Sequence, residues 1–279
     1  MEAIKMKMRW MSALSAAGVF VFASCSFAQN ANVGNPDGEI DGIAHIAYRV
    51  SNLDAELAFL KKLGYEEAFR MTRAGRTSEV FVKVNDRQFI EVYPRTESNQ
   101  PLGWMLVCYE SADLNALHDA LVAHGLKPTP VQKAAAGNLI TSLNDPSGRT
   151  TEFTQYMPGS LHALDRGKHL GANRLSDTLL GFDLPVQNLQ AARDFYTKLG
   201  FELESADQTL RMTTQGNENL RIEVRAEQPG ALAETLFTVS DAKDAEGQLR
   251  YEGLESKRIR KLVIVQDPDG NPLIFLQSQ

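Results

Sequence analysis

The chain contains very little cysteine: Cys25 and Cys108 are the only two among 279 residues. With so few thiols, a network of disulfides cannot hold the fold together, and stability must come from a hydrophobic core. Neither a Gly-rich phosphate loop nor a serine-nucleophile motif is present, so nothing favours a P-loop protein or a serine hydrolase. Basic residues are also few, since 29 Lys and Arg face 35 Asp and Glu. We therefore expect no binding to nucleic acid.

Long hydrophobic runs are absent except near the start of the chain. There an uncharged apolar run, from about residue 10 to residue 23, follows three basic residues, and it is too short for a membrane anchor. Small residues at Ser26 and Ala28 then form a cleavage site. This pattern predicts a signal peptide over residues 1–28 and a secreted or periplasmic protein that begins at Gln29, without membrane attachment.

A lipoprotein is the alternative, because Cys25 could become the lipid-bearing first residue. Phe22 suits that signal poorly, which favours cleavage after Ala28. Such cleavage removes three basic residues and one acidic residue, so the net charge of −6 becomes −8. The mature chain then keeps Cys108 alone and cannot form an internal disulfide.

The rest of the chain is a duplication, in which the first similar segments of the two copies are 136 residues apart. "AYRVSNLDAELAFLKKLGYEEAF" at 47–69 is answered by "DLPVQNLQAARDFYTKLGFELES" at 183–205, and "NDPSGRTTEFTQ" at 144–155 by "QDPDGNPLIFLQ" at 266–277. Each copy is double inside, because a second strand followed by a helix begins near its midpoint. The helices are expected to end at glycine: Gly64, Gly125, Gly200 and Gly253.

These patterns predict an α+β fold of four βαβββ modules. Residues 38–158 are expected to form the first domain and residues 176–279 the second. Residues 159–175 show no sustained period and are interpreted as a connector.

The leading "HIAYRV", the "KLGY" and "KLGF" helix ends and the closing "DPSGRTTEF" and "DPDGNPLIF" resemble the vicinal oxygen chelate superfamily. This superfamily includes glyoxalases, extradiol dioxygenases and bleomycin resistance proteins. The resemblance implies that paired modules curve into a cup with the helices outside. It also implies that residues of the first and last strands hold a divalent metal ion on the inner face.

Period-two alternation sorts the side chains of this expected cup. In residues 43–50 it directs Ile43, His45, Ala47 and Arg49 inward and Ala44, Ile46, Tyr48 and Val50 towards the helices. Glu91 and Glu152 also point inward. The resemblance implies metal ligation by His45 and Glu152, with Glu91 at a position that only some members use, and a catalytic role for Glu152. The other inward polar side chains are expected to bind substrate: Arg49, Tyr93, Thr154 and Tyr156.

The chain departs from the family pattern at one expected ligand. Our alignment places Leu106 where the first strand of the second module should supply a ligand. Either Glu91 and water complete the shell, or affinity is weak, or the cup binds its ligand without metal. In the second copy Gly181 and Ile274 replace His45 and Glu152, while Glu223 and Glu234 remain. We interpret that copy as non-catalytic.

Other residues with metal or nucleophile chemistry carry less weight. Cys108 lies in an apolar stretch and is expected to be a buried, inert thiol. His118, His124, His162 and His169 are expected to be solvated or capping.

Two function classes remain. The first is a metal-dependent lyase, isomerase or dioxygenase that uses Zn, Fe, Mn or Ni on a small substrate with neighbouring oxygens. The second is a module that only binds a small organic molecule. The protein is expected to be a monomer or a homodimer.

Overall fold

The computed structural model describes residues 39–204, 209–213 and 219–278. The predicted signal peptide lies outside these residues. The described chain forms two sheets of eight strands each, and the strand order of the first is repeated in the second. The α+β fold with paired modules is therefore confirmed.

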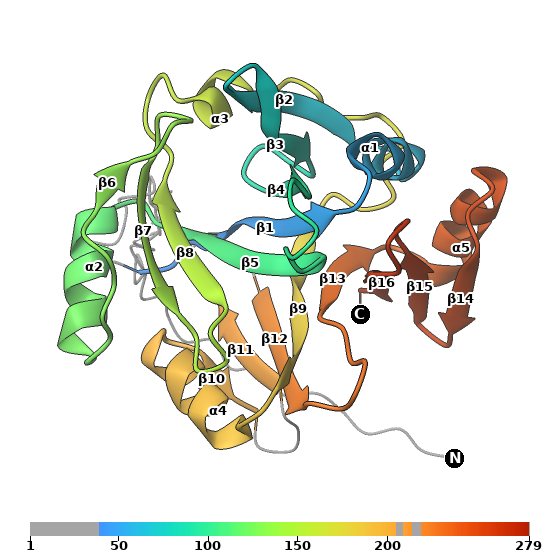
Figure 1. The fold of residues 1–279 in the computed structure, drawn as a ribbon. Coiled ribbons are helices and arrows are strands. Elements are labelled where there is room, and N and C mark those ends of the chain that lie inside the picture. The colour runs from blue at the N-terminus through green and yellow to red at the C-terminus, as the bar shows by residue number, and fades with distance from the viewer. Residues whose placement is uncertain (1–38, 205–208, 214–218, 279) are drawn as a thin grey trace, which may run out of the picture. The chain divides into compact units, whose positions relative to one another are not determined.

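The first sheet has the order β2-β3-β4-β1-β5-β8-β7-β6, and it curls into a half-barrel (Figure 1). β1 lies at its centre, parallel to β4 and antiparallel to β5. The elements of this copy are β1 (Gly42–Val50), α1 (Leu53–Lys62), β2 (Glu66–Arg73), β3 (Arg76–Lys83), β4 (Phe89–Pro94), β5 (Gly103–Glu110), α2 (Leu114–Ala123), β6 (Gln132–Lys133), β7 (Leu139–Asn144) and β8 (Thr150–Gln155).

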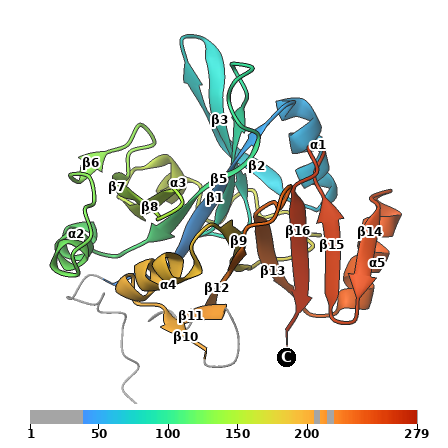
Figure 2. The same ribbon diagram turned by 60° about the horizontal axis from the view of Figure 1, so that its bottom comes forward.

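The second sheet has the order β10-β11-β12-β9-β13-β16-β15-β14. Figure 2 shows its strands β13, β16, β15 and β14 side by side beyond β9. The elements are β9 (Leu179–Val186), α4 (Leu189–Lys198), β10 (Glu202–Leu203), β11 (Thr209–Thr213), β12 (Asn219–Ala226), β13 (Glu234–Val239), α5 (Ala242–Tyr251), β14 (Ser256–Ile259), β15 (Leu262–Gln266) and β16 (Pro272–Gln277). Between the copies, the predicted connector contains the short helix α3 (Leu161–Leu164).

The four long helices end as the sequence predicts, and each begins at a capping side chain. Each starts after an Asn or Asp whose side chain accepts a hydrogen bond from a first-turn backbone N–H, as Asn52 does from Ala55. Each is followed by a glycine with positive φ, for example 84° at Gly64. Side chains rarely adopt this left-handed conformation, so glycine marks the point where the chain leaves the helix.

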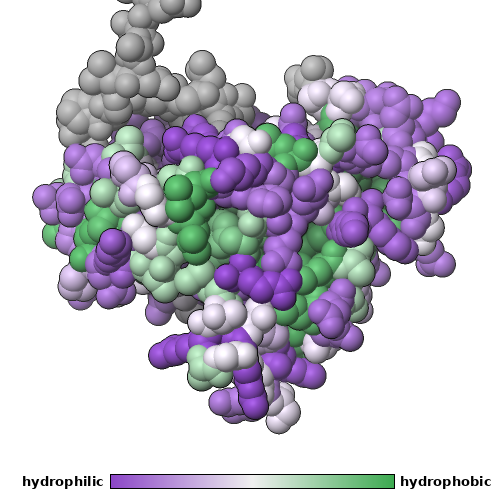
Figure 3. Space-filling view, turned by 90° about the horizontal axis from the view of Figure 1, so that it is seen from above, coloured by the Kyte–Doolittle hydropathy of each residue, from purple (hydrophilic) through white to green (hydrophobic). Residues whose placement is uncertain are grey.

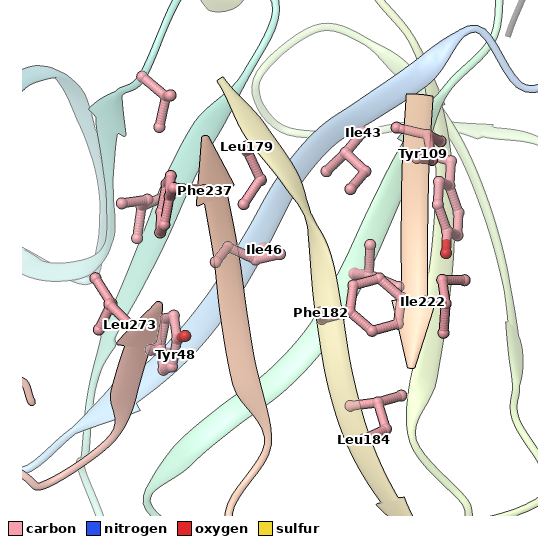
Figure 4. Close-up of a cluster of buried hydrophobic side chains, with 14 of the residues drawn as sticks. Ile43, Ile46, Tyr48, Tyr109, Leu179, Phe182, Leu184, Ile222, Phe237 and Leu273 are labelled. Carbon is pink, nitrogen blue, oxygen red and sulfur yellow. The ribbon is translucent and has the colours of Figure 1, made fainter. Parts of the chain in front are cut away.

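One continuous hydrophobic core lies behind β1 and includes residues of both copies. Ile46 and Tyr48 of β1 belong to this core together with Phe182 of β9 and Phe237 of β13 (Figure 4). The hydroxyl groups of Tyr48 and Thr235 are hydrogen-bonded to each other across this contact. The second copy therefore supports the strand that carries His45.

A β-bulge changes which side chains of β1 face the cup. The pairing of β1 with β5 skips from Ile43 to His45, so Ala44 is the extra residue. Ile43 packs in the main core, whereas Ala44 packs with Cys108 on the other side of the sheet. The predicted inward position of Ile43 and outward position of Ala44 are therefore wrong, because strict alternation fails at a bulge.

Among the described residues, no helix has the length and hydropathy needed to cross a membrane. On the face that is seen from above, hydrophobic residues form separate patches between hydrophilic side chains (Figure 3).

Candidate metal centre

His45, Glu91 and Glu152 come from three different strands and meet on the inner face of the first sheet. Nε2 of His45 lies 3.3 Å from Oε2 of Glu91 on β4 and 3.9 Å from Oε2 of Glu152 on β8. The His45 and Glu91 side chains are 9% and 5% exposed, whereas that of Glu152 is 25% exposed. The structure thus places both predicted carboxylate ligands beside His45 and leaves that of Glu152 accessible from outside.

The imidazole of His45 is buried and has no hydrogen-bond partner at either nitrogen among the described residues. Burial lowers the pKa of His45 to about 3, because a charged ring loses its hydration there. The ring is therefore neutral near pH 7, and a neutral imidazole is the form that binds a metal ion.

The two carboxyl groups lie in an environment that opposes their negative charge. Burial, followed by the charge of Glu79, raises the pKa of both Glu91 and Glu152. Within the described part of the chain, neither Lys nor Arg forms an ion pair with either group. Tyr93 donates a hydrogen bond of 2.8 Å to Oε1 of Glu91, which fixes that carboxyl group.

Glu79 on β3 is a member of this acidic cluster that the sequence analysis missed. It lies in "RTSEVFVK", where the side chains of β3 alternate between the two faces of the sheet. Phe81, two residues further on, pairs with Glu91 in the β3–β4 ladder. Alternation along β3 could have identified Glu79 if that strand had been compared with β4.

Cys108 lies opposite His45 in the first sheet, whereas Leu106 occupies the position in β5 that His45 occupies in β1. His45 pairs with Cys108 on β5, and Cys108 pairs with Glu152 on β8. Leu106 lies opposite Ala47. In the two parallel ladders Ala47 pairs with Glu91 and Cys108 pairs with Glu152, and His45 and Leu106 each lie two residues earlier. Leu106 is therefore the equivalent of His45, as the alignment places it, and Cys108 is an additional donor beside that position.

The side chains in this row are compatible with a divalent ion. Donor atoms of His45, Cys108 and Glu152 lie within 4.8 Å of one another. Ligands about 2.0–2.3 Å from a tetrahedral ion are separated by roughly 3.3–3.8 Å, close to the 3.3 and 3.9 Å between His45 and the two carboxylates. A cation would also stabilise a buried imidazole that has no hydrogen-bond partner among the described residues, beside carboxyl groups that have no Lys or Arg partner there.

The predicted substrate-binding residues differ in how their polar groups are engaged. Tyr93 contacts Glu91, and Arg49 donates to the carbonyl oxygen of Pro101 at 3.2 Å near the exposed end of β1. The hydroxyl of Thr154 donates to the carbonyl oxygen of Leu139 at 3.0 Å. Tyr156 donates to the carbonyl oxygen of Arg87 at 2.9 Å. Thr154 and Tyr156 thus use their hydroxyl protons within the protein.

The expectation that His162 is solvated or capping is wrong. His162 is 3% exposed, and its ring stacks on that of Tyr156 with 4.8 Å between the ring centroids. Its Nδ1 lies 2.9 Å from the amide nitrogen of Asn138, and its Nε2 has no partner among the described residues. The cause is a long-range contact: the N–H of Leu161 donates to the carbonyl of Ala136, which brings α3 back against the first sheet. The ring also contacts Phe69, Phe81 and Phe89.

The remaining histidines lie elsewhere. His118 pairs with the side chain of Asp119, the ring of His124 contacts the carbonyl of Lys198, and His169 pairs with Asp165.

The second copy has an apolar row at the same place in its sheet. Gly181 pairs with Leu236, and Leu236 pairs with Ile274, in the same ladders that align His45, Cys108 and Glu152. The carboxylates that remain have basic partners: Glu223 pairs with Arg221, and Glu234 pairs with Arg225. Each of these carboxylates of the second copy therefore has an arginine partner, which Glu91 and Glu152 lack among the described residues.

Comparisons with known proteins agree with this fold. Residues 42–153 match the family model described as Glyoxalase/Bleomycin resistance protein/Dioxygenase superfamily. No curated protein matches the chain by sequence. Among solved structures, the 2,3-dioxygenase LapB from Pseudomonas sp. KL28 is similar with a TM-score of 0.64 and 16% identity, over 86% of this chain and 93% of that one.

Two other solved structures are similar over the same share of this chain. A catechol 2,3-dioxygenase has a TM-score of 0.63 and 15% identity, over 86% of this chain and 89% of its own. The Mn(II)-bound glyoxalase from Novosphingobium aromaticivorans has a TM-score of 0.63 and 16% identity, over 86% of this chain and 83% of its own.

Proposed function

We propose, because residues 42–153 match the model of the Glyoxalase/Bleomycin resistance protein/Dioxygenase superfamily, that the first cup of this chain is a metal-dependent active site. The substrate is a small organic molecule with two neighbouring oxygen atoms. The reaction is a proton transfer of the lyase or isomerase kind. The observation that carries this proposal is the buried imidazole of His45, which has no hydrogen-bond partner among the described residues and lies beside Glu91 and Glu152.

A divalent ion held by His45, Glu91 and Glu152 would supply positive charge that polarises the substrate oxygens. Zn, Fe, Mn and Ni all suit nitrogen and carboxylate donors. The protein contributes a neutral imidazole and a carboxyl group fixed by Tyr93. Since these groups are buried, water is largely excluded from the ligand atoms.

Glu152 is the group best placed to move a proton. Its side chain is 25% exposed, against 5% for Glu91, so a substrate in the cup can reach it. Burial and the charge of Glu79 raise the pKa of Glu152, and a carboxyl group with a raised pKa is a better base near neutral pH. Glu152 accepts the proton from the carbon beside the substrate oxygens and returns it at the neighbouring carbon.

Matched variants in the two copies test the metal site. Glu91 and Glu223 occupy equivalent register positions, because they pair with Ala47 and Asp183 in the two parallel ladders. We expect His45→Ala, Glu91→Ala and Glu152→Ala each to lower metal occupancy of the purified protein by about tenfold or more, as the loss of a ligand should. Glu223→Ala should leave occupancy unchanged.

Metal analysis after mild dialysis and reloading measures the occupancy. If the wild type held no divalent ion under any loading condition, the active-site proposal would fail. Deuterium exchange from solvent into a substrate then separates catalysis from binding. A cup that binds metal and small ligands without exchange or turnover would be a binding module.

A further inference from the structure

Three side chains form a straight row across three neighbouring strands of the first sheet. His45 on β1 pairs with Cys108 on β5, which pairs with Glu152 on β8. Residues paired across adjacent strands point to the same face, and the donor atoms of these three lie within 4.8 Å. Cys108 is fully buried in the middle of this row.

We propose that Cys108 is itself a ligand, so that the metal ion of the first cup is held by nitrogen, sulfur and oxygen donors. This inference rests on the proposed function and names the residue that selects the metal. The thiol proton is released to solvent when the sulfur binds the ion, and no oxidant is needed. The site then favours Zn²⁺ or Co²⁺ over Mn²⁺, because thiolate sulfur is a soft donor and Mn²⁺ prefers oxygen.

The alternative interpretation is that Cys108 is a small apolar residue that only fills space in the core. It does pack against Ala44, Ala47 and Leu106, and buried free cysteines often have only this role. A residue that only fills space, however, does not require metal-binding side chains as its neighbours. Here the sulfur lies in one row with an imidazole that has no hydrogen-bond partner among the described residues and with a carboxylate that has no basic partner.

The second copy provides an internal comparison for this row. Leu236 occupies the place of Cys108, between Gly181 and Ile274. Where the imidazole and the carboxylate are absent, the middle position is thus an ordinary aliphatic residue. Cysteine occurs at this position only together with the two other donors.

Cobalt spectroscopy tests the sulfur ligand directly. A thiolate bound to Co²⁺ gives a charge-transfer band in the near ultraviolet that nitrogen and oxygen ligands do not give. The chain has two cysteines, so the proteins are compared with residues 1–28 retained, and the Cys25→Ser variant serves as the control. We expect the band in the wild type and in Cys25→Ser, and its loss in Cys108→Ser, with cobalt bound in all three proteins.

Metal selectivity provides a second readout. Cys108→Ser should weaken Zn²⁺ binding by about tenfold or more while changing Mn²⁺ binding by less than about threefold. Cys108→Ala is a second variant if the serine protein does not fold, and thermal unfolding of both checks this. Stoichiometric cobalt binding without the band in the wild type would overturn the sulfur ligand and leave the site of His45, Glu91 and Glu152 intact. The absence of any bound cobalt would overturn both proposals.

Discussion

Glu56 should make the protein less stable as the pH rises. Glu56 lies on the buried face of α1 and is 3% exposed. Its Oε2 has no hydrogen-bond partner among the described residues. Burial, followed by the charges of Asp267 and Asp269 in the turn between β15 and β16, raises the pKa of Glu56 from 4.5 to about 8. Asp269 also accepts hydrogen bonds from the backbone N–H and the hydroxyl of Ser51.

The direction of this pH effect depends on whether the folded or the unfolded chain binds the proton of Glu56 more tightly. In the unfolded chain Glu56 loses its proton near its ordinary pKa of 4.5, whereas in the folded protein it keeps the proton to about pH 8. Between these values unfolding releases a proton, so the free energy of unfolding falls as the pH rises and levels off above about pH 8. At about 1.4 kcal/mol for each unit of pKa difference, the fall attributable to Glu56 is at most about 5 kcal/mol.

Glu56→Gln removes the charge and keeps the shape of the side chain. We expect this variant and the wild type to have similar stability near pH 4, and the variant to be about 2–5 kcal/mol more stable near pH 9. Urea unfolding at several pH values measures the difference. Glu66→Gln, at an exposed position of β2, is the matched control and should follow the wild type. Parallel stability curves for Glu56→Gln and the wild type would refute the reasoning.

Three further predictions concern single sites. Lys83→Met should lower the free energy of unfolding by about 3–5 kcal/mol in urea, because the fully buried Lys83 is paired with Asp86 and the buried Asp165; exposed Lys133→Met should have little effect. Tyr93→Phe removes the 2.8 Å hydrogen bond to Glu91 and should weaken metal binding about tenfold in a chelator competition, whereas unchanged affinity would show that Tyr93 does not position Glu91. N-terminal sequencing of the exported protein should give Gln29, and a lipidated Cys25 would disprove the predicted cleavage site.

Much of the fold could be predicted because it depends on local signals that occur twice. The asparagine and aspartate caps and the glycines after the helices set the helix bounds in both copies. The similar segments that recur in the second half of the chain then indicated the modules. For the site, alternation within single strands was sufficient to direct His45, Glu91 and Glu152 to one face, where the structure places both carboxylates beside His45.

The rest depended on pairing between strands and on long-range packing. A bulge at Ala44 leaves no trace in the pattern of apolar residues, since Ile43 and Ala44 are both apolar, yet it decides which residue of β5 lies opposite His45. His162 was misjudged because its burial is caused by the return of α3 to the first sheet. Neither feature follows from the periodicity of one segment.

The duplication explains how the first sheet can keep such an unfavourable row of side chains. Burying an imidazole and two carboxyl groups costs free energy, and the strand that carries His45 must be stabilised from its other face. Phe182 and Phe237 of the second copy lie in that core together with Ile46. In the second copy, the position equivalent to His45 has no room for a side chain, because a Cβ at Gly181 would lie 1.6 Å from the carbonyl oxygen of Arg221. A side chain there would require β9 and β12 to separate, which would disturb the core behind β1. The backbone contact at Gly181 therefore keeps the second copy in a supporting role and confines the proposed chemistry to the first.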